Sequence, residues 1–193
     1  VKESGCTGRL GEKLLAIVCD GGRSRVYISP TKEHEELVED IEVEKEPSFE
    51  LNYDPRAIWT PPYGLTTYAD LFTKRQLKAM HVFCDLISDA RKQALADGAS
   101  EGLADAIATY LAFGLDRLAD FNCALSRWKS SGEQQMQVFG RQAIPMVWDF
   151  AEANILSNST GCFLSGIEQV IRVLKKLNPS YQGAVQQQDA ITQ

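Results

Sequence analysis

Two small groups of charged residues have the types and spacing that chemistry requires. Asp149 and Glu152 stand three positions apart, so on a helix they would share one face and could act together as a general acid and base. Solvated or capping side chains are the alternative, and we favour it. Lys74, Arg75 and Lys78 form a basic cluster that could contact a carboxylate or a phosphate, or could form a solvated face.

A third candidate is Trp59-Thr60-Pro61-Pro62-Tyr63. Amino-methylating enzymes use (Asp/Asn/Ser)-Pro-Pro-(Tyr/Phe) to hold a target amine, with the aromatic ring stacked on a flipped base. Here Thr60 stands first, and its hydroxyl is a weaker acceptor than a carboxylate or amide oxygen. We therefore predict a rigid proline loop, with a catalytic motif as the alternative.

Several other chemistries find no support in the sequence. It contains no Gly-x-Gly-x-x-Gly, no P-loop and no Gly-x-Ser-x-Gly pattern. Five widely spaced cysteines and two histidines lack the clustering of a zinc site, so we expect reduced thiols and no metal. Cysteines of this kind are typical of the cytoplasm, where we place the protein. The longest apolar run is shorter than the roughly 18 residues of a membrane span, and we expect neither a signal peptide nor a membrane partner.

The charge is uneven along the 193 residues. The formal net charge is −6, with 26 acids against 20 bases. Residues 31–50 hold nine acids and two lysines, whereas residues 71–193 hold twelve charges of each sign. A surface that binds phosphates throughout would be basic. The acidity therefore opposes DNA contact only before residue 70.

The first of two predicted regions, residues 1–70, combines short elements with a proline-rich connection. The runs 14–19 and 25–28 flank Asp20-Gly21-Gly22 and predict a β-hairpin. A short helix is expected within residues 33–39. Prolines between residues 44 and 62 predict an extended connection.

The second region, residues 71–193, has the spacing of helices. Thr73 and Gln76 have capping-box spacing before a helix that ends near Gly98. Ser100 begins a second helix, which we expect to end at residues 130–132, antiparallel to the first. Residues 145–153 fit a helix or a buried strand equally well. A third helix spans 163–177 after a cap at Thr160, and a short strand near 183–186 ends the chain. The predicted fold class is predominantly helical α+β.

Three segments resemble the large prokaryotic adenine-specific DNA methylases that carry a zinc ribbon. They are Tyr63–Leu77 (YGLTTYADLFTKRQL), Leu103–Asp120 (LADAIATYLAFGLDRLAD) and Phe139–Asn154 (FGRQAIPMVWDFAEAN). In that family an Asp-Pro-Phe-x-Gly-Gly-Gly cofactor loop lies upstream of this region, and the catalytic Asp-Pro-Pro-Tyr lies downstream. Neither occurs here. We therefore expect an internal section of an α/β methyltransferase, inactive by itself.

The resemblance implies S-adenosylmethionine as cofactor and DNA as partner. Phe72-Thr73 resembles the Phe-Thr-Pro element that approaches the methionine end of the cofactor, although Lys74 replaces proline. Asp189, beyond the last strand, matches an acid that binds the adenine of the cofactor. The expected cofactor-binding residues are Phe72, Thr73, Asp149, Glu152, Asn154 and Asp189. The expected DNA-binding residues are Lys74, Arg75, Lys78 and Arg141.

A second hypothesis needs no catalysis. The chain could be a helical interaction module that binds protein or nucleic acid. Its nucleic-acid version requires nine basic residues to converge on one surface: Lys74, Arg75, Lys78, Arg127, Lys129, Arg141, Arg172, Lys175 and Lys176.

Overall fold

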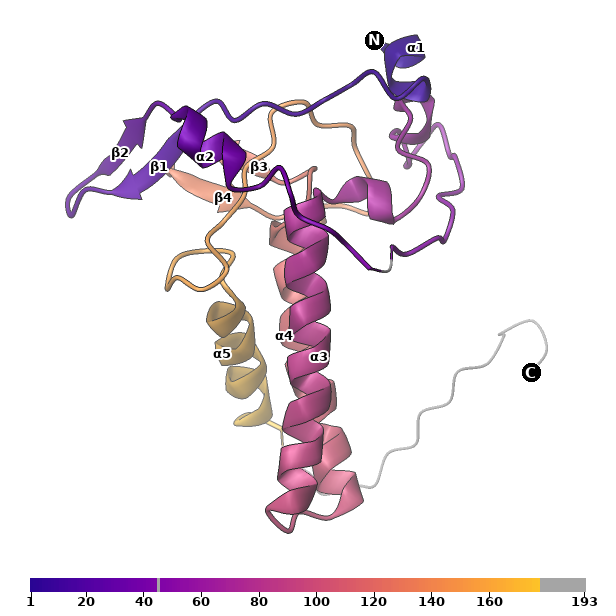
Figure 1. The fold of residues 1–193 in the computed structure, drawn as a ribbon. Coiled ribbons are helices and arrows are strands. Elements are labelled where there is room, and N and C mark those ends of the chain that lie inside the picture. Colours follow the sequence, from indigo (N-terminus) through magenta and orange to yellow (C-terminus); the bar gives the residue numbers. More distant parts are fainter. Residues whose placement is uncertain (45, 178–193) are drawn as a thin grey trace.

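The computed structural model describes residues 1–44 and 46–177 as a mixed α+β fold dominated by helices, with two small antiparallel hairpins (Figure 1). A long helical hairpin projects from one side of a layer of short elements. The α-helices are α1 (Lys2–Cys6), α2 (Lys32–Glu36), α3 (Lys74–Ala96), α4 (Glu101–Phe121) and α5 (Phe163–Leu174). The strands are β1 (Ile17–Asp20), β2 (Arg25–Ile28), β3 (Arg127–Lys129) and β4 (Gln134–Met136), and two 3-10 turns are η1 (Pro61–Tyr63) and η2 (Ala69–Leu71).

The helical hairpin begins and ends where its local signals predict. The Thr73 hydroxyl accepts the backbone N–H of Gln76, and the Gln76 side chain accepts the N–H of Thr73, which completes the capping box. Gly98 follows α3 with φ of 92°, a conformation that glycine adopts without strain. Ser100 caps α4. An ion pair of 2.6 Å joins Arg91 Nε to Asp105 Oδ1 and confirms the antiparallel pairing.

Helix α5 packs against α4 at a point where both helices carry glycine. A Cβ on Gly114 would lie 2.3 Å from Ile167 Cδ1, and a Cβ on Gly166 would lie 3.0 Å from the Gly114 carbonyl oxygen. Phe163 stacks on Phe83 of α3 with ring centroids 4.4 Å apart. The N-cap of α5 is Cys162, not the predicted Thr160, and the helix ends at Leu174. These contacts fix α5 against the helical hairpin.

The predicted end of the second helix, at residues 130–132, is wrong. Helix α4 ends at Phe121 because the next residue, Asn122, is buried and bonds to distant backbone. Its Nδ2 donates to the Gly161 carbonyl over 2.7 Å, and its Oδ1 accepts the Ala153 N–H over 2.9 Å. The chain then forms the β3–β4 hairpin, in which Arg127 pairs with Met136.

Residues 145–153 form neither of the two structures that the sequence left open. The stretch is irregular, with isolated bridges that pair Ile144 with Ile58 and Phe150 with Arg127. Distant segments satisfy its backbone. Ile144 N–H donates to the Ala57 carbonyl over 2.7 Å, and Ala151 N–H donates to the Ser126 carbonyl over 2.8 Å. The segment makes strand-like hydrogen bonds without a continuous ladder. This explains why the periodicity of the sequence could not distinguish a helix from a strand.

The buried core lies where the helical hairpin meets the layer of short elements. Leu51, Leu71, Cys123, Leu125 and Ile144 form one buried cluster, with residues from both sides of the predicted boundary at 70. That boundary stays a prediction. The expected β1–β2 hairpin and the short helix α2 are confirmed. The predicted strand near 183–186 and Asp189 lie outside the described residues.

Replacing Gly114 with valine should destabilise the fold through the α4–α5 crossing. The added side chain would collide with Ile167, so we expect Gly114→Val to cost about 1–3 kcal/mol in the free energy of unfolding. A Cβ on Gly102, also in α4, would have no atom within 4 Å, so Gly102→Val should stay within about 0.5 kcal/mol of wild type. Chemical denaturation measures both. Equal losses would contradict this packing.

Candidate functional site

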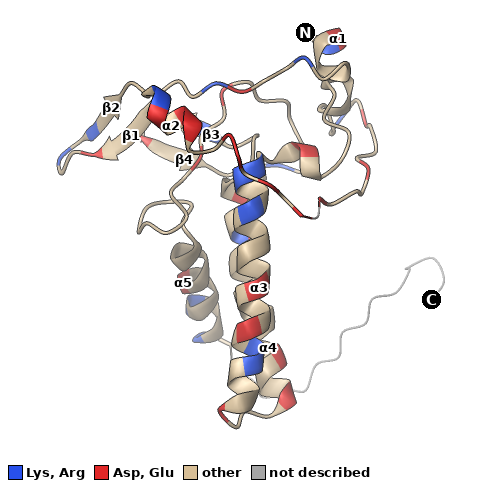
Figure 2. Ribbon diagram, viewed as in Figure 1, with Lys and Arg blue, Asp and Glu red and all other residues tan. Residues whose placement is uncertain are grey.

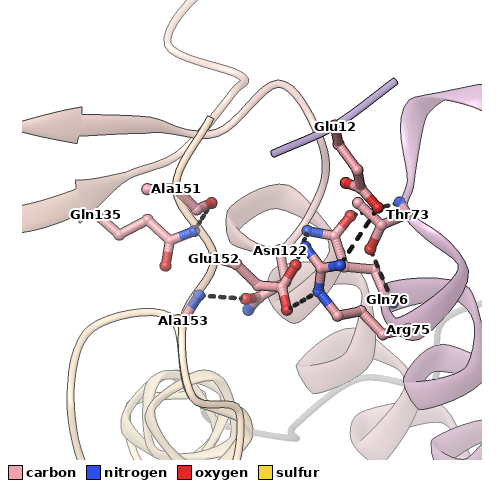
Figure 3. A network of polar contacts seen from close by, with 9 residues as sticks. All are labelled: Glu12, Thr73, Arg75, Gln76, Asn122, Gln135, Ala151, Glu152 and Ala153. Atoms are coloured by element: carbon pink, nitrogen blue, oxygen red, sulfur yellow. Dashed lines mark hydrogen bonds and ion pairs between the residues drawn. The ribbon is translucent and has the colours of Figure 1, made fainter. Parts of the chain in front are cut away.

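A polar junction ties the start of α3 to the irregular stretch that contains Glu152. We use this name for the side chains of Glu12, Thr73, Arg75, Gln76 and Glu152 (Figure 3). Arg75 Nε lies 2.7 Å from Glu152 Oε1, and Gln76 Nε2 donates to Glu152 Oε2 over 2.9 Å. Arg75 Nη1 also lies 3.4 Å from Glu12 Oε1. Glu152 therefore uses both oxygens to hold the segments 63–77 and 139–154 together.

The surroundings of Arg75 keep its guanidinium charged. Partial burial by itself would lower the pKa of Arg75, but the hydrogen bond and the charge of Glu152 outweigh burial, and Glu12 adds a smaller contribution in the same direction. The pKa of Arg75 is consequently raised above its ordinary value. The charge serves the ion pair with Glu152, while the predicted DNA contact of Arg75 stays a prediction.

Two buried amides hold the backbone that follows the junction. Asn122 Oδ1 binds the Ala153 N–H, and Gln135 Nε2 donates to the Ala151 carbonyl over 2.8 Å (Figure 3). Gln135 Nε2 and the Ser126 hydroxyl also donate to the Phe121 carbonyl at the end of α4. Sequence reasoning missed these residues, because neither amide belongs to a motif and each takes its partners from far along the chain.

A cavity of about 600 Å³ opens beside the junction. Four aromatic side chains line it: Tyr68, Phe72, Phe113 and Phe139. Leu71, Cys123, Leu125 and Ile144 of the buried core complete its apolar wall. The volume falls within the range of small-molecule sites. The segments 63–77, 103–120 and 139–154 all contribute, through Phe72, Phe113 and Phe139 respectively.

The polar wall of the cavity comes from the second half of α4. Arg117 Nη1 lies 2.6 Å from Asp120 Oδ2, while Asp120 Oδ1 accepts the N–H groups of Val138 and Phe139 over 3.1 and 2.9 Å. Arg117 also lies over the Phe121 ring, 4.6 Å from its centroid. Its Nε is buried and has no hydrogen-bond partner within the described chain. Asp116 has no cation within 4.0 Å among the residues that the structure describes.

The six predicted cofactor-binding residues do not form one cluster. Phe72 lines the cavity, Thr73 caps α3 and Glu152 belongs to the polar junction. Asp149 and Asn154 are exposed, and Asn154 accepts the Leu156 N–H in a local turn. The acid–base pair of Asp149 and Glu152 on one helical face is wrong, because no helix forms there. Asp189 lies outside the described residues.

The predicted DNA-binding residues also separate. Lys74 and Lys78 are exposed on α3, Arg75 is paired with Glu152, and Arg141 lies over the Trp59 ring, 5.2 Å from its centroid. The Thr60-Pro61-Pro62-Tyr63 motif forms the 3-10 turn η1. Thr60 is fully buried, and its hydroxyl has no partner in the described part of the chain. The rigid loop is therefore what the structure contains.

No family model, curated protein or solved structure matches this chain. Within residues 1–44 and 46–177, no three His, Cys, Asp or Glu side chains gather in a way that could hold a metal ion. No helix in the described ranges has the length and apolar character needed to cross a bilayer.

Removing the charge of Glu152 should loosen the polar junction. Glu152→Gln leaves Arg75 partly buried without its main partner, so we expect a loss of about 1–2 kcal/mol in the free energy of unfolding. The matched change Glu12→Gln removes the longer, more exposed pair and should cost less than about 0.5 kcal/mol. Urea denaturation of both variants measures the difference. A larger loss for Glu12→Gln would contradict the assignment.

The buried thiol of Cys123 should make stability depend on alkaline pH. Burial raises the pKa of Cys123, and hydrogen bonds from Leu125 and Ser126 oppose this only in part. The folded thiol therefore keeps its proton where the unfolded thiol, with a pKa of about 8.5, has lost it. The stabilisation is complete below that pH and is lost as the pH rises above it. The test is the free energy of unfolding of wild type and Cys123→Ala, measured below and above this pH. If both proteins lose stability equally as the pH rises, Cys123 is not the cause.

Proposed function

We propose that this chain is an internal section of an S-adenosylmethionine-dependent adenine-N6 DNA methyltransferase. One observation carries the proposal. The three segments that resemble the methylases lie apart in the sequence, yet each contributes an aromatic side chain to the same cavity. If these segments only packed a hydrophobic core, their side chains would fill the space between them. A shared cavity of this size therefore favours a binding site.

The walls of the cavity suit the cofactor that the resemblance implies. Aromatic rings from four positions can stack on adenine, and their faces attract a cation such as a sulfonium. Arg117, which lines the cavity beside its ion pair with Asp120, can bind a carboxylate through its guanidinium. Phe72 and Phe139 would hold the cofactor, which supplies the methyl group for the exocyclic amine of adenine. The Gly-rich loop and Asp-Pro-Pro-Tyr that complete such a site are not in these residues.

The polar junction supports the proposal by fixing the cavity wall. Phe72 immediately precedes Thr73, so the capping box and the Arg75–Glu152 pair set the backbone from which the Phe72 side chain projects. A bound cofactor needs such preorganised walls, because every side chain that must become ordered on binding costs affinity. Thr73 and Glu152 are thus positioning residues in this proposal.

The alternative, an interaction module that binds phosphates, finds less support. Its nine basic residues lie on four separate parts of the fold: the start of α3, strand β3, the loop at Arg141 and the end of α5 (Figure 2). Arg75 is paired with Glu152, and Arg172 is paired with Glu168. These charges do not converge on one surface, which the nucleic-acid version requires.

Calorimetry with S-adenosylmethionine on the intact protein tests the proposal. Phe139 is 60% exposed at the cavity, so Phe139→Ala removes a stacking partner with little effect on the core. We expect binding about tenfold weaker, since stacking on an aromatic ring contributes roughly 1–3 kcal/mol. Phe72→Ala should weaken binding similarly.

The matched control is Phe49→Ala, which removes a phenyl ring that is 76% exposed away from the cavity lining and should leave affinity unchanged. Absence of binding by the wild-type protein would overturn the methyltransferase proposal. Normal binding by Phe139→Ala and Phe72→Ala would show that the cofactor occupies another site.

A further inference from the structure

Two chain segments run side by side at the end of the fold that carries α1. Ile144 N–H donates to the Ala57 carbonyl over 2.7 Å, and the Ile144 carbonyl accepts the Trp59 N–H over 3.0 Å. These bonds give Ile58 and Ile144 a parallel bridge. Residues 57–63 and 141–148 are therefore held in fixed register, and we call them the paired segments.

The paired segments carry three aromatic rings, and two of the rings have a cation over one face. Arg141 lies over Trp59, and Lys2 Nζ lies 5.4 Å from the centroid of the Tyr63 ring. Trp148 meets Tyr63 edge to face, with centroids 5.3 Å apart. Even in this contact Trp148 is 56% exposed. Trp148 thus keeps more than half of its surface accessible next to Tyr63, the ring over which Lys2 lies.

Helix α1 holds Lys2 in place through an unusually close backbone contact. A Cβ on Gly64, whose φ is 93°, would lie 2.5 Å from the carbonyl carbon of Gly5, and a Cβ on Gly5 would lie 1.9 Å from the Tyr63 carbonyl oxygen. Only glycines permit this approach. This contact fixes the backbone of α1 beside Tyr63, and the exposed Lys2 side chain reaches over the Tyr63 ring.

The acids that oppose DNA contact before residue 70 are concentrated in residues 31–50, outside the paired segments, where Lys2 and Arg141 are left uncompensated. Nearby Arg9 pairs with Glu3 at 3.6 Å, and Arg56 pairs with Asp54 at 3.4 Å. No carboxylate of the described chain lies within 4.0 Å of Lys2 or Arg141. Exposed Asp149 follows Trp148 and opposes this positive charge.

We infer that the paired segments form a DNA-contacting surface, in which Trp148 stacks on an unpaired base while Lys2 and Arg141 contact flanking phosphates. That the bound nucleic acid is DNA follows from the proposed function, on which this inference rests. Accessible aromatic rings combined with positive charges on the same surface are the arrangement by which proteins bind single-stranded or locally opened nucleic acid. An enzyme that acts on an amine within a duplex must open the duplex, and this surface would hold an exposed base of the opened strand.

Fluorescence anisotropy of a labelled single-stranded oligonucleotide with the intact protein tests the surface. We expect Trp148→Ala to weaken binding about tenfold, because it removes the stacking partner. Trp148→Phe keeps a ring against Tyr63 and should recover part of the affinity. Arg141→Gln and Lys2→Gln should each reduce the slope of log affinity against log salt by about one. Asp149→Asn should strengthen binding, since it removes a charge that repels phosphate.

The controls are Phe49→Ala for an exposed ring and Lys175→Gln for an exposed cation on another element, and both should bind like wild type. Wild-type affinity in Trp148→Ala and Arg141→Gln would overturn the inference. If those two variants bind normally while the wild-type protein binds S-adenosylmethionine, only the surface assignment fails. If the wild-type protein binds neither cofactor nor DNA, the proposed function fails as well.

Discussion

The rest of the structure depends on how buried polar groups satisfy an irregular backbone. Residues 143–161 form no helix and no continuous strand, yet they run against the buried end of α4. A backbone in that position must find hydrogen-bond partners or lose stability. Asn122 and Gln135 provide them through their side-chain amides, and Glu152 adds a charged contact to Arg75. These few side chains therefore supply the hydrogen bonds that a β-sheet would otherwise supply to this segment.

This way of folding explains why a cavity survives beside the core. A continuous sheet would bring apolar side chains into regular contact and fill the space between layers. Here the layer is attached at separate points, by Asn122 at one place and by the polar junction at another. Phe72, which also packs against the buried core, and Phe139 both line this cavity.

The sequence was informative where a signal is local. Thr73, Gln76 and Ser100 cap helices within three residues of themselves, so their spacing predicts where α3 and α4 begin. Asn122 could not be interpreted in the same way. Its partners Ala153 and Gly161 are 31 and 39 residues away, and they end α4 although the apolar stripe continues to Leu125. The cavity, likewise, joins positions whose spacing carries no period, so periodicity could not indicate it.

One short stretch links the two proposed binding surfaces. Phe139 and Ile144 line the cavity, whereas Arg141 and Trp148 belong to the paired segments. Both backbone groups of Ile144 are bonded to residues 57–59, so the stretch cannot slide relative to its neighbour without breaking two hydrogen bonds. Transfer between two bound molecules requires their reacting atoms to be held in a constant relation. A stretch that contributes to both surfaces, and is fixed at its centre, meets that requirement more directly than two surfaces joined by a flexible loop.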